Sequence, residues 1–191
     1  FVLLIAGVLY LLRRQEPYAA MNGQTMGTYY NIKVRADNDD KLLHKSIKDE
    51  LQKINEQMSV FDANSEISRI NKAEADTWID LSPEMSLVLK SAYQNYRKSG
   101  GTFDPTIGKL IDLWGFGASG MQKYPDETEI KDVLADSGFD KIVFSEDFRR
   151  LKKKNANVVL NLSAIAKGYG VDRIAARRSE EHTSELQSLA Y

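Results

Sequence analysis

The sequence predicts an α+β fold, in which helices and strands follow one another without the steady alternation of an α/β protein. Two observations favour this class. Several segments place apolar residues at helical spacing, and others are short runs rich in Tyr, Ile and Val between turn residues. A length of 191 residues suggests one domain, and 42% hydrophobic with 28% charged residues is typical of a globular chain.

The first half of the chain is expected to begin with a strand at Thr28–Arg35. A helix follows at Lys41–Met58, because apolar residues recur there every three or four positions. These residues are Leu43, Ile47, Leu51, Ile54 and Met58. Ser65 is expected to cap a short helix that ends at Asn71, and Trp78–Leu81 reads as a brief strand.

Ser82 followed by Pro83 marks the start of another helix, and Gly100 marks its end. The residues expected to be buried on this helix are Val88, Leu89, Ala92, Tyr93 and Tyr96. Further along, Asp126 and Glu129 form a capping box for a helix ending near Gly138.

Three strands are expected after this helix, at Lys141–Ser145, Arg149–Lys153 and Val158–Leu162. The first two are interpreted as a pair around a Glu-Asp-Phe turn. Ser163 then begins a last helix that holds Val171 and Ile174.

Composition argues against several classes of function. The formal net charge is −1, and without a basic stripe nothing points to nucleic acid. A local basic run, Arg149, Arg150 and Lys152–Lys154, is interpreted as one solvated strand or turn face. The chain has no cysteine, so no disulfide framework or thiolate chemistry is predicted.

Four sequence blocks combine glycines, aromatics and polar turn residues in a way that core packing rarely needs. The most informative is Gly100–Gly117, GGTFDPTIGKLIDLWGFG. The others are Gly23–Val34 (GQTMGTYYNIKV), Ser59–Asn71 (SVFDANSEISRIN) and Asn161–Asp172 (NLSAIAKGYGVD). Taken alone, the first could equally be a turn-rich loop with two core aromatics.

In this order the four blocks resemble the FAD:protein FMN transferases, the ApbE or thiamine biosynthesis lipoprotein family. The resemblance covers about residues 23–177. It implies the α+β fold of that family and Mg²⁺-dependent transfer of FMN from FAD to a Thr or Ser hydroxyl of a target flavoprotein. FAD is then the substrate, Mg²⁺ the metal, and the partners are exported or membrane flavoproteins of electron transport.

The resemblance also implies where the site lies. Contacts with FAD fall on Met26, Phe61, Thr102, Phe103, Asp104, Ser163 and Tyr169. The main-chain carbonyl of Ala166 falls where the family has a Mg²⁺ ligand. The remaining metal ligands and the catalytic residues are expected downstream of Tyr191, so these residues alone are expected to be inactive.

Elementary chemistry fits the same positions but leaves alternatives open. The helix start after Asn161 offers free N–H groups to an anion, and Lys167 could add a positive charge. A plain helix cap with a solvated lysine explains those residues as well. Asp104 before Pro105 could equally be an Asx-turn residue that shapes the loop.

The other residues in the blocks are interpreted either as ring-packing side chains or as structural support. Met26 offers a polarizable thioether to a flavin or adenine ring, and Phe61 offers a stacking face. Trp114 and Phe116 are interpreted as core or loop support. The capping and loop-fixing residues are expected to be Ser65, Glu66 and Asn71.

The ends of the chain are interpreted separately. Residues 1–14 begin with FVLLIAGVLYLL and continue with two arginines, which is typical of part of a signal anchor or signal peptide. Residues 15–22 read as a linker. Without a lipobox cysteine a retained anchor is favoured, which places the domain on the periplasmic, extracytoplasmic face of the inner membrane. Residues 178–191 resemble the translation of a sequencing adapter and are expected to be a non-native tail.

Two other functions remain open from the sequence. The first is an extracytoplasmic FAD-binding module without turnover. The second is an FAD pyrophosphatase that yields FMN and AMP. The sequence does not separate them, because the residues that would decide are expected beyond this segment.

Overall fold

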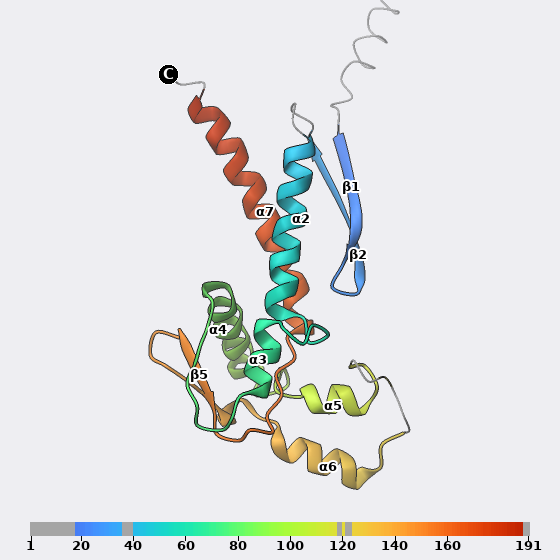
Figure 1. The fold of residues 1–191 in the computed structure, drawn as a ribbon, viewed down its shortest axis with the longest axis vertical. Helices are drawn as coiled ribbons and strands as arrows, with labels where there is room; N and C mark the ends of the chain where they lie inside the picture. Colours follow the sequence, from blue (N-terminus) through green and yellow to red (C-terminus); the bar gives the residue numbers. More distant parts are fainter. Residues whose placement is uncertain (1–17, 36–39, 118–119, 121–123, 189–191) are drawn as a thin grey trace, which may run out of the picture. The chain divides into compact units, whose positions relative to one another are not determined.

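The computed structural model describes residues 18–35, 40–117, 120 and 124–188. The expected membrane segment at residues 1–14 therefore lies outside the described residues. The chain divides into two compact units, Phe1–Gln52 and Lys53–Tyr191, with the division inside helix α2 (Asp40–Met58). Figure 1 shows the elements, which mix helices and antiparallel strands and confirm the α+β prediction.

The first unit contains a β-hairpin of β1 (Tyr18–Thr25) and β2 (Thr28–Arg35). The prediction of β2 is confirmed. The linker expected at residues 15–22 differs from the structure, because residues 18–22 belong to β1. Its Ala, Asn and Gly residues carry little strand propensity, so no strand was predicted there. Tyr30 lies opposite Gly23, where an added Cβ would be 2.6 Å from the tyrosine hydroxyl.

Helix α2 follows the predicted apolar spacing. Ile47, Leu51, Ile54 and Met58 are all buried, whereas Leu42 is 65% exposed. This contrast is the amphipathic pattern of a helix with one face in a core.

After the end of α2, the second unit continues with α3 (Glu66–Lys72) and α4 (Pro83–Lys98), both capped as predicted. The Ser65 hydroxyl accepts from the Ser68 amide, and the Ser82 hydroxyl accepts from the Met85 amide. At the other end of α4, Gly100 has a φ of +62°, and its N–H and that of Gly101 close a Schellman motif.

A three-stranded antiparallel sheet has the order β3-β5-β4, formed by Ile79–Asp80, Arg150–Lys153 and Ile142–Phe144. The predicted pairing of the last two strands is confirmed. On β5 the side chains of Leu151 and Lys153 are buried while Arg150 is exposed. The interpretation of the basic run as solvated throughout is therefore wrong at Lys153.

The aromatic residues of α4 differ from the prediction. Tyr93 and Tyr96 are only half-buried, and both pack on Phe139 with ring centroids 5.6 and 5.3 Å away. Together with the phenylalanines at the β4–β5 turn, they line an open cavity of about 640 Å³.

The remaining elements are α5 (Gly108–Leu113), α6 (Glu127–Asp136), a 3₁₀ turn η1 (Phe139–Lys141) and α7 (Ser163–Ser188). The capping box of Asp126 and Glu129 is confirmed. The strand predicted at Val158–Leu162 is wrong: its only ladder contact among the described residues is a parallel bridge between Val159 and Ile107. An asparagine side chain, described below, occupies the other edge.

Candidate functional site

Backbone hydrogen bonds join the block at Gly100–Gly117 to the block at Asn161–Asp172 and to the residues just before it. The Gly108 N–H donates to the Val159 carbonyl at 3.0 Å, and the Asn161 N–H donates to the Pro105 carbonyl at 2.8 Å. The loop that carries Asp104 is thereby fixed in register with the chain that enters α7. Thr102, Phe103 and Asp104 precede one side of this junction, and Ser163 follows the other.

Close approach of the two segments requires glycine at position 108. A Cβ there would lie 2.6 Å from the Val159 carbonyl oxygen, inside the contact distance of two atoms. Gly108 is buried. From the sequence this glycine was interpreted only as part of its block, although glycine is a residue that lets backbone come close to another group.

Asp104 shapes its own loop. Its Oδ1 accepts from the Thr106 N–H at 2.8 Å and from the Thr106 hydroxyl at 2.6 Å. The Thr106 hydroxyl oxygen in turn accepts from the Gly138 N–H at 2.6 Å, and Thr106 is 1% exposed. The Asx-turn interpretation of Asp104 is therefore confirmed. A contact between Asp104 and FAD stays a prediction.

Beside Asp104, the loop presents both a polar and an aromatic side chain. Thr102 is exposed and Phe103 is half-buried. The Phe103 N–H donates to the Ser99 hydroxyl at 3.0 Å, which ties the loop to the end of α4. This arrangement presents one hydroxyl and part of one ring to solvent.

The start of α7 has the geometry of a helix N-terminus that faces solvent. The Asn161 Oδ1 accepts from the Ser163 N–H at 2.9 Å, and the Leu162 carbonyl accepts from Ile165 and Ala166. Ser163 and Lys167 are exposed. Unpaired amides and the dipole at such an end favour an anion.

Tyr169 lies six residues after Ser163 on α7. It is half-buried and lines a cavity of about 410 Å³ between α4 and α7, together with Leu87, Gly168 and Asp172. A Cβ added at Gly168 would meet no atom within 4 Å, so this glycine leaves open space beside the ring.

Phe61 is 65% exposed in the loop between α2 and α3. The Ser65 hydroxyl donates to the Ser59 carbonyl at 2.7 Å across this loop, and Glu66 Oε1 accepts from the Ser82 N–H at 2.7 Å. These bonds agree with the loop-fixing roles expected for Ser65 and Glu66. The loop holds a phenylalanine with one face free for stacking.

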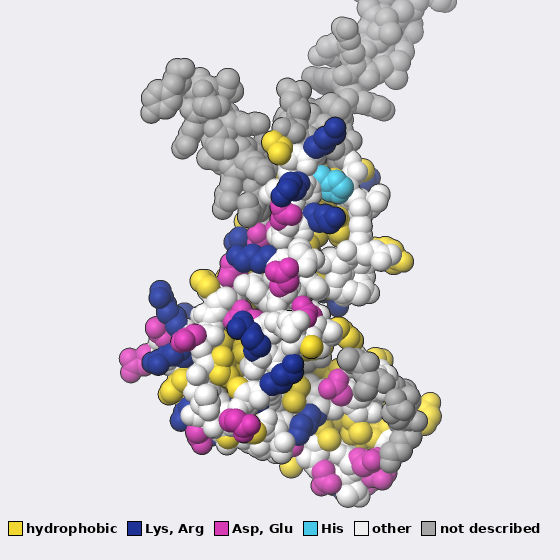
Figure 2. Space-filling view, viewed as in Figure 1, with side chains coloured by type: hydrophobic (Ala, Val, Ile, Leu, Met, Phe, Trp, Pro, Cys, Tyr) yellow, Lys and Arg dark blue, Asp and Glu magenta, His cyan; other side chains and the backbone are white. Residues whose placement is uncertain are grey.

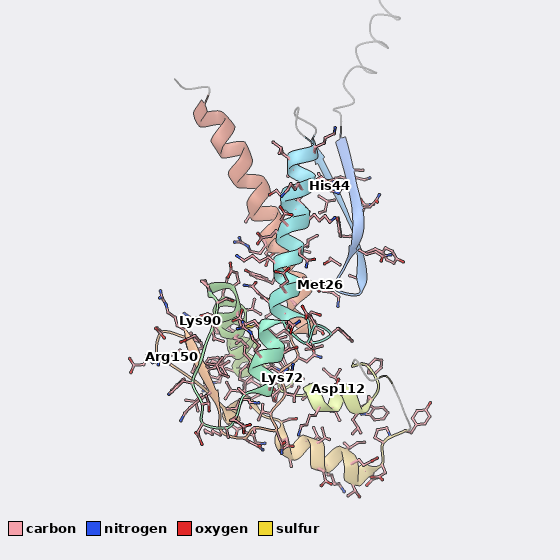
Figure 3. All side chains as sticks on the ribbon, viewed as in Figure 1. Met26, His44, Lys72, Lys90, Asp112 and Arg150 are labelled. Atoms are coloured by element: carbon pink, nitrogen blue, oxygen red, sulfur yellow. The ribbon has the colours of Figure 1, made fainter. Side chains whose placement is uncertain are left out.

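Met26 occupies the two-residue turn of the hairpin, labelled in Figure 3. Its φ is +49° and that of Gly27 is +70°. Such a turn normally carries Asn-Gly, because a methionine with positive φ is strained. Strain of this kind is often kept where a side chain serves a ligand.

Trp114 and Phe116, at the WGFG end of the first block, were interpreted as core or loop support, and their exposure contradicts the core alternative alone. Phe116 is 76% exposed and Trp114 is 36% exposed. Gly117 lies against Asp112, whose Oδ1 would be 1.5 Å from a Cβ at that position. Desolvation raises the pKa of Asp112.

The described residues do not fit a magnesium site by themselves. Mg²⁺ prefers octahedral oxygen coordination, and no cluster of three His, Cys, Asp or Glu side chains within the described ranges could hold a metal. Ala166 lies in the first turns of α7, where a helical carbonyl accepts the amide four residues ahead. The carbonyl expected as a ligand therefore stands without the other ligands here.

On the face seen in Figure 2, the described charged side chains of both signs are interspersed, with lysine and arginine among aspartate and glutamate. The cations over Trp78, from Arg150 and Lys152, are 5.3 and 5.6 Å from its ring centroid.

The sequence matches the model of the ApbE family over residues 26–186. The chain belongs to the ApbE family. It is 31% identical to the FAD:protein FMN transferase of Haemophilus influenzae over 173 residues, which are 86% of this chain and 50% of that protein. It is 32% identical to the FAD:protein FMN transferase of Vibrio cholerae, covering 90% of this chain and 52% of that protein.

Solved structures give the same result for the fold. The flavin transferase ApbE from Vibrio cholerae superposes with a TM-score of 0.82 at 32% identity, covering 86% of this chain and 54% of that one. The apo flavinyl transferase ApbE of Pseudomonas stutzeri gives 0.78 at 28% identity, with 86% and 53% covered. The ApbE-like fold is thereby confirmed, and the chain spans about half the length of these relatives.

Proposed function

We propose that this chain is part of an enzyme that transfers FMN from FAD to a Thr or Ser hydroxyl of a target flavoprotein. The observation that carries the proposal is the register between two segments: Pro105 and Gly108 bond to Asn161 and Val159. This register gathers Asp104 and Ser163, which the family resemblance assigns to FAD. Relatives at 31% and 32% identity are named for this reaction.

In the reaction, the acceptor oxygen forms a bond to the FMN phosphorus while the bridging P–O bond of the pyrophosphate breaks. AMP leaves with the bonding electrons, and the hydroxyl proton passes to a base outside the described residues. Phosphoryl transfer of this type depends mainly on positioning and on stabilising the developing negative charge.

Each expected site residue would help to bind or orient FAD. The amides at the start of α7 face an anion such as a pyrophosphate, and Lys167 adds a positive charge nearby. Phe61 would supply a face for an isoalloxazine or adenine ring. Tyr169 borders the cavity between α4 and α7. Mg²⁺ would supply Lewis-acid stabilisation of the phosphates, with ligands besides Ala166 coming from outside the described residues.

The test uses the full-length protein with FAD, Mg²⁺ and a candidate acceptor domain. Transfer predicts a covalent mass increase of one FMN on the acceptor and release of AMP, both lost when EDTA removes Mg²⁺. Free FMN with AMP would instead identify a pyrophosphatase. Tight FAD binding with no AMP would identify a flavin-binding module.

We further propose that the domain works on the extracytoplasmic face of the inner membrane, held by the segment at residues 1–14. The support is the apolar run FVLLIAGVLYLL at residues 1–12, which is typical of part of a signal anchor or signal peptide. Among the described residues, none of the helices combines the length and hydrophobicity that crossing a bilayer requires. A reporter fused after Arg177 should be active only when exported, and activity in the cytoplasm alone would refute this placement.

A further inference from the structure

Lys153 is a buried cation with no assigned part in binding FAD. Its exposed fraction is 0%, and its ammonium donates to the main-chain oxygens of Asn71, Ala156 and Val158 at 2.7, 2.8 and 3.3 Å. An ammonium has three N–H donors, so each has a carbonyl. Desolvation lowers the pKa of Lys153, because burial disfavours the charged form, and a buried ammonium needs hydrogen-bond partners such as these three carbonyls.

The Asn71 side chain bonds to the same edge of this stretch of chain, two residues further along at Leu160. Its side-chain Oδ1 accepts from the Leu160 N–H at 2.8 Å, and its Nδ2 donates to the Leu160 carbonyl at 2.8 Å. One carboxamide thus replaces the two bonds that a neighbouring strand would make. Since the main-chain oxygen of Asn71 also accepts from Lys153, these two residues form one clamp.

The clamped segment carries the junction between the two sequence blocks. Val158, Leu160 and Leu162 are each 0% exposed. The residues between them, Val159 and Asn161, bond to the loop at Gly108 and Pro105. Figure 1 shows this connection from β5 to α7 running alongside α3.

We propose that Asn71 and Lys153 are positioning residues of the FAD site. By fixing the backbone of Val158 and Leu160, they set the register between the Asp104 loop and the start of α7 at Ser163. They act through this backbone without touching the flavin nucleotide. The inference rests on the proposed function, because it concerns how the same site is built.

The first test replaces Asn71 by aspartate in the full-length protein and measures the dissociation constant for FAD across pH. An ionised carboxylate accepts from the Leu160 N–H, but it repels the Leu160 carbonyl instead of donating to it. We expect FAD binding to weaken about tenfold or more at pH 8 and to recover toward wild type as acid protonates the carboxyl. Asn71→Leu, which has no donor at any pH, should weaken binding without recovery.

The charged groups around residue 71 set where the recovery falls. Lys153 contacts its main-chain oxygen from β5, and Glu74 and Lys109 lie close enough to act on that ammonium. The Lys153 ammonium favours the ionised form of the introduced carboxyl, so recovery belongs at the acid end of the series. Each value is divided by that of the wild type at the same pH, which removes titration elsewhere.

A second test uses two adjacent lysines. Lys153→Met keeps the side-chain volume but removes three donors, so FAD affinity should fall about tenfold or more and the amides of residues 158–166 should exchange faster. Lys152→Met is the matched control. Lys152 lies on the opposite face of β5, where it pairs with Asp76 at 3.1 Å, so its loss should change neither readout.

The outcomes separate this inference from the proposed function. A wild type that binds FAD but transfers no FMN refutes the transfer reaction alone, since the clamp is judged by affinity. Equal losses at all pH values in Asn71→Asp and Asn71→Leu would overturn the clamp. So would unchanged affinity and exchange in Lys153→Met. A wild type that binds no FAD would overturn both.

Discussion

The Asp104 carboxylate and Thr106 form a closed two-bond turn, in which one oxygen accepts both the amide and the hydroxyl of the threonine. The threonine hydroxyl then accepts from Gly138, at the end of α6. An acidic residue expected at the flavin is therefore also a structural element of its loop. Different substitutions of Asp104 are needed to distinguish a contact with FAD from the shaping of the loop.

Asp104→Asn and Asp104→Ala separate the two roles. Asparagine keeps an oxygen for Thr106, so we expect stability near that of the wild type. Alanine leaves the Thr106 amide and hydroxyl without this acceptor and should cost about 1–2 kcal/mol of unfolding free energy. If the charge contacts FAD, both variants lose affinity; if Asp104 only shapes the loop, only alanine does. Chemical denaturation and FAD titration measure the two quantities.

Phe61→Ala should weaken FAD binding by about ten- to a hundredfold while leaving stability unchanged. The physical reason is that the ring is 65% exposed, so its removal empties no core. Tyr124→Ala is the control, because that ring is 81% exposed and outside the four sequence blocks. Equal affinity for the Phe61 variant and the wild type would remove this residue from the site.

Met26→Asn should stabilise the protein and weaken its FAD binding. Asparagine tolerates the φ of +49° better than methionine, which is worth about 0.5–1 kcal/mol. If the thioether packs on a ring of FAD, affinity falls in the same variant. Met26→Leu keeps the apolar bulk and should stay within a few-fold of wild-type affinity. Thermal unfolding and calorimetric titration test this, and a gain in both quantities would contradict a ligand role.

Gly108→Ala should destabilise the protein, because its Cβ would lie 2.6 Å from the Val159 backbone oxygen. The two segments would have to separate, at a cost of about 1–3 kcal/mol. Gly168→Ala offers a matched control within α7. That Cβ meets nothing within 4 Å, and alanine is the better helix former, so stability should rise by about 0.5–1 kcal/mol. Equal stability changes in the two variants would show that the close contact is absent.

Elements with local signals were predictable from the sequence. The Asp126–Glu129 capping box, the Ser82 N-cap and the helix end at Gly100 each depend on residues close together in the sequence. The local sequence is therefore enough to predict them. The family blocks also predict that the Asp104 loop and the start of α7 belong to one site, and this stays a prediction.

Features that depend on distant partners were not predictable. Asn71 meets Leu160 across 89 residues, and Lys153 meets Asn71 across 82. In the sequence, Lys153 is one of three consecutive lysines, and nothing distinguishes the one that is buried. The strand predicted at Val158–Leu162 rested on local residues, which do not reveal that the Asn71 side chain occupies its edge.

The contacts of Glu84 predict that the stability of the second unit falls at acid pH. Its carboxylate accepts from Lys53 at 2.5 Å and from Gln57 at 3.2 Å, and it lies in the first turn of α4. The Lys53 bond is the largest cause that lowers the pKa of Glu84 below its ordinary 4.5. A lowered carboxyl pKa stabilises the fold above the unfolded-state value, and this stabilisation is lost as pH falls through the folded-state value.

The wild type should therefore lose stability more steeply between about pH 5 and 3 than Glu84→Gln, by about 0.5–1 kcal/mol. The small figure reflects the lysine, whose side chain is 52% exposed and screened by water. Glu127→Gln on α6 is the control, since its side chain is 92% exposed and 3.8 Å from Lys131. Denaturation curves at each pH measure the slopes, and parallel slopes for wild type and Glu84→Gln would show that the Lys53 pair does not hold the carboxylate in solution.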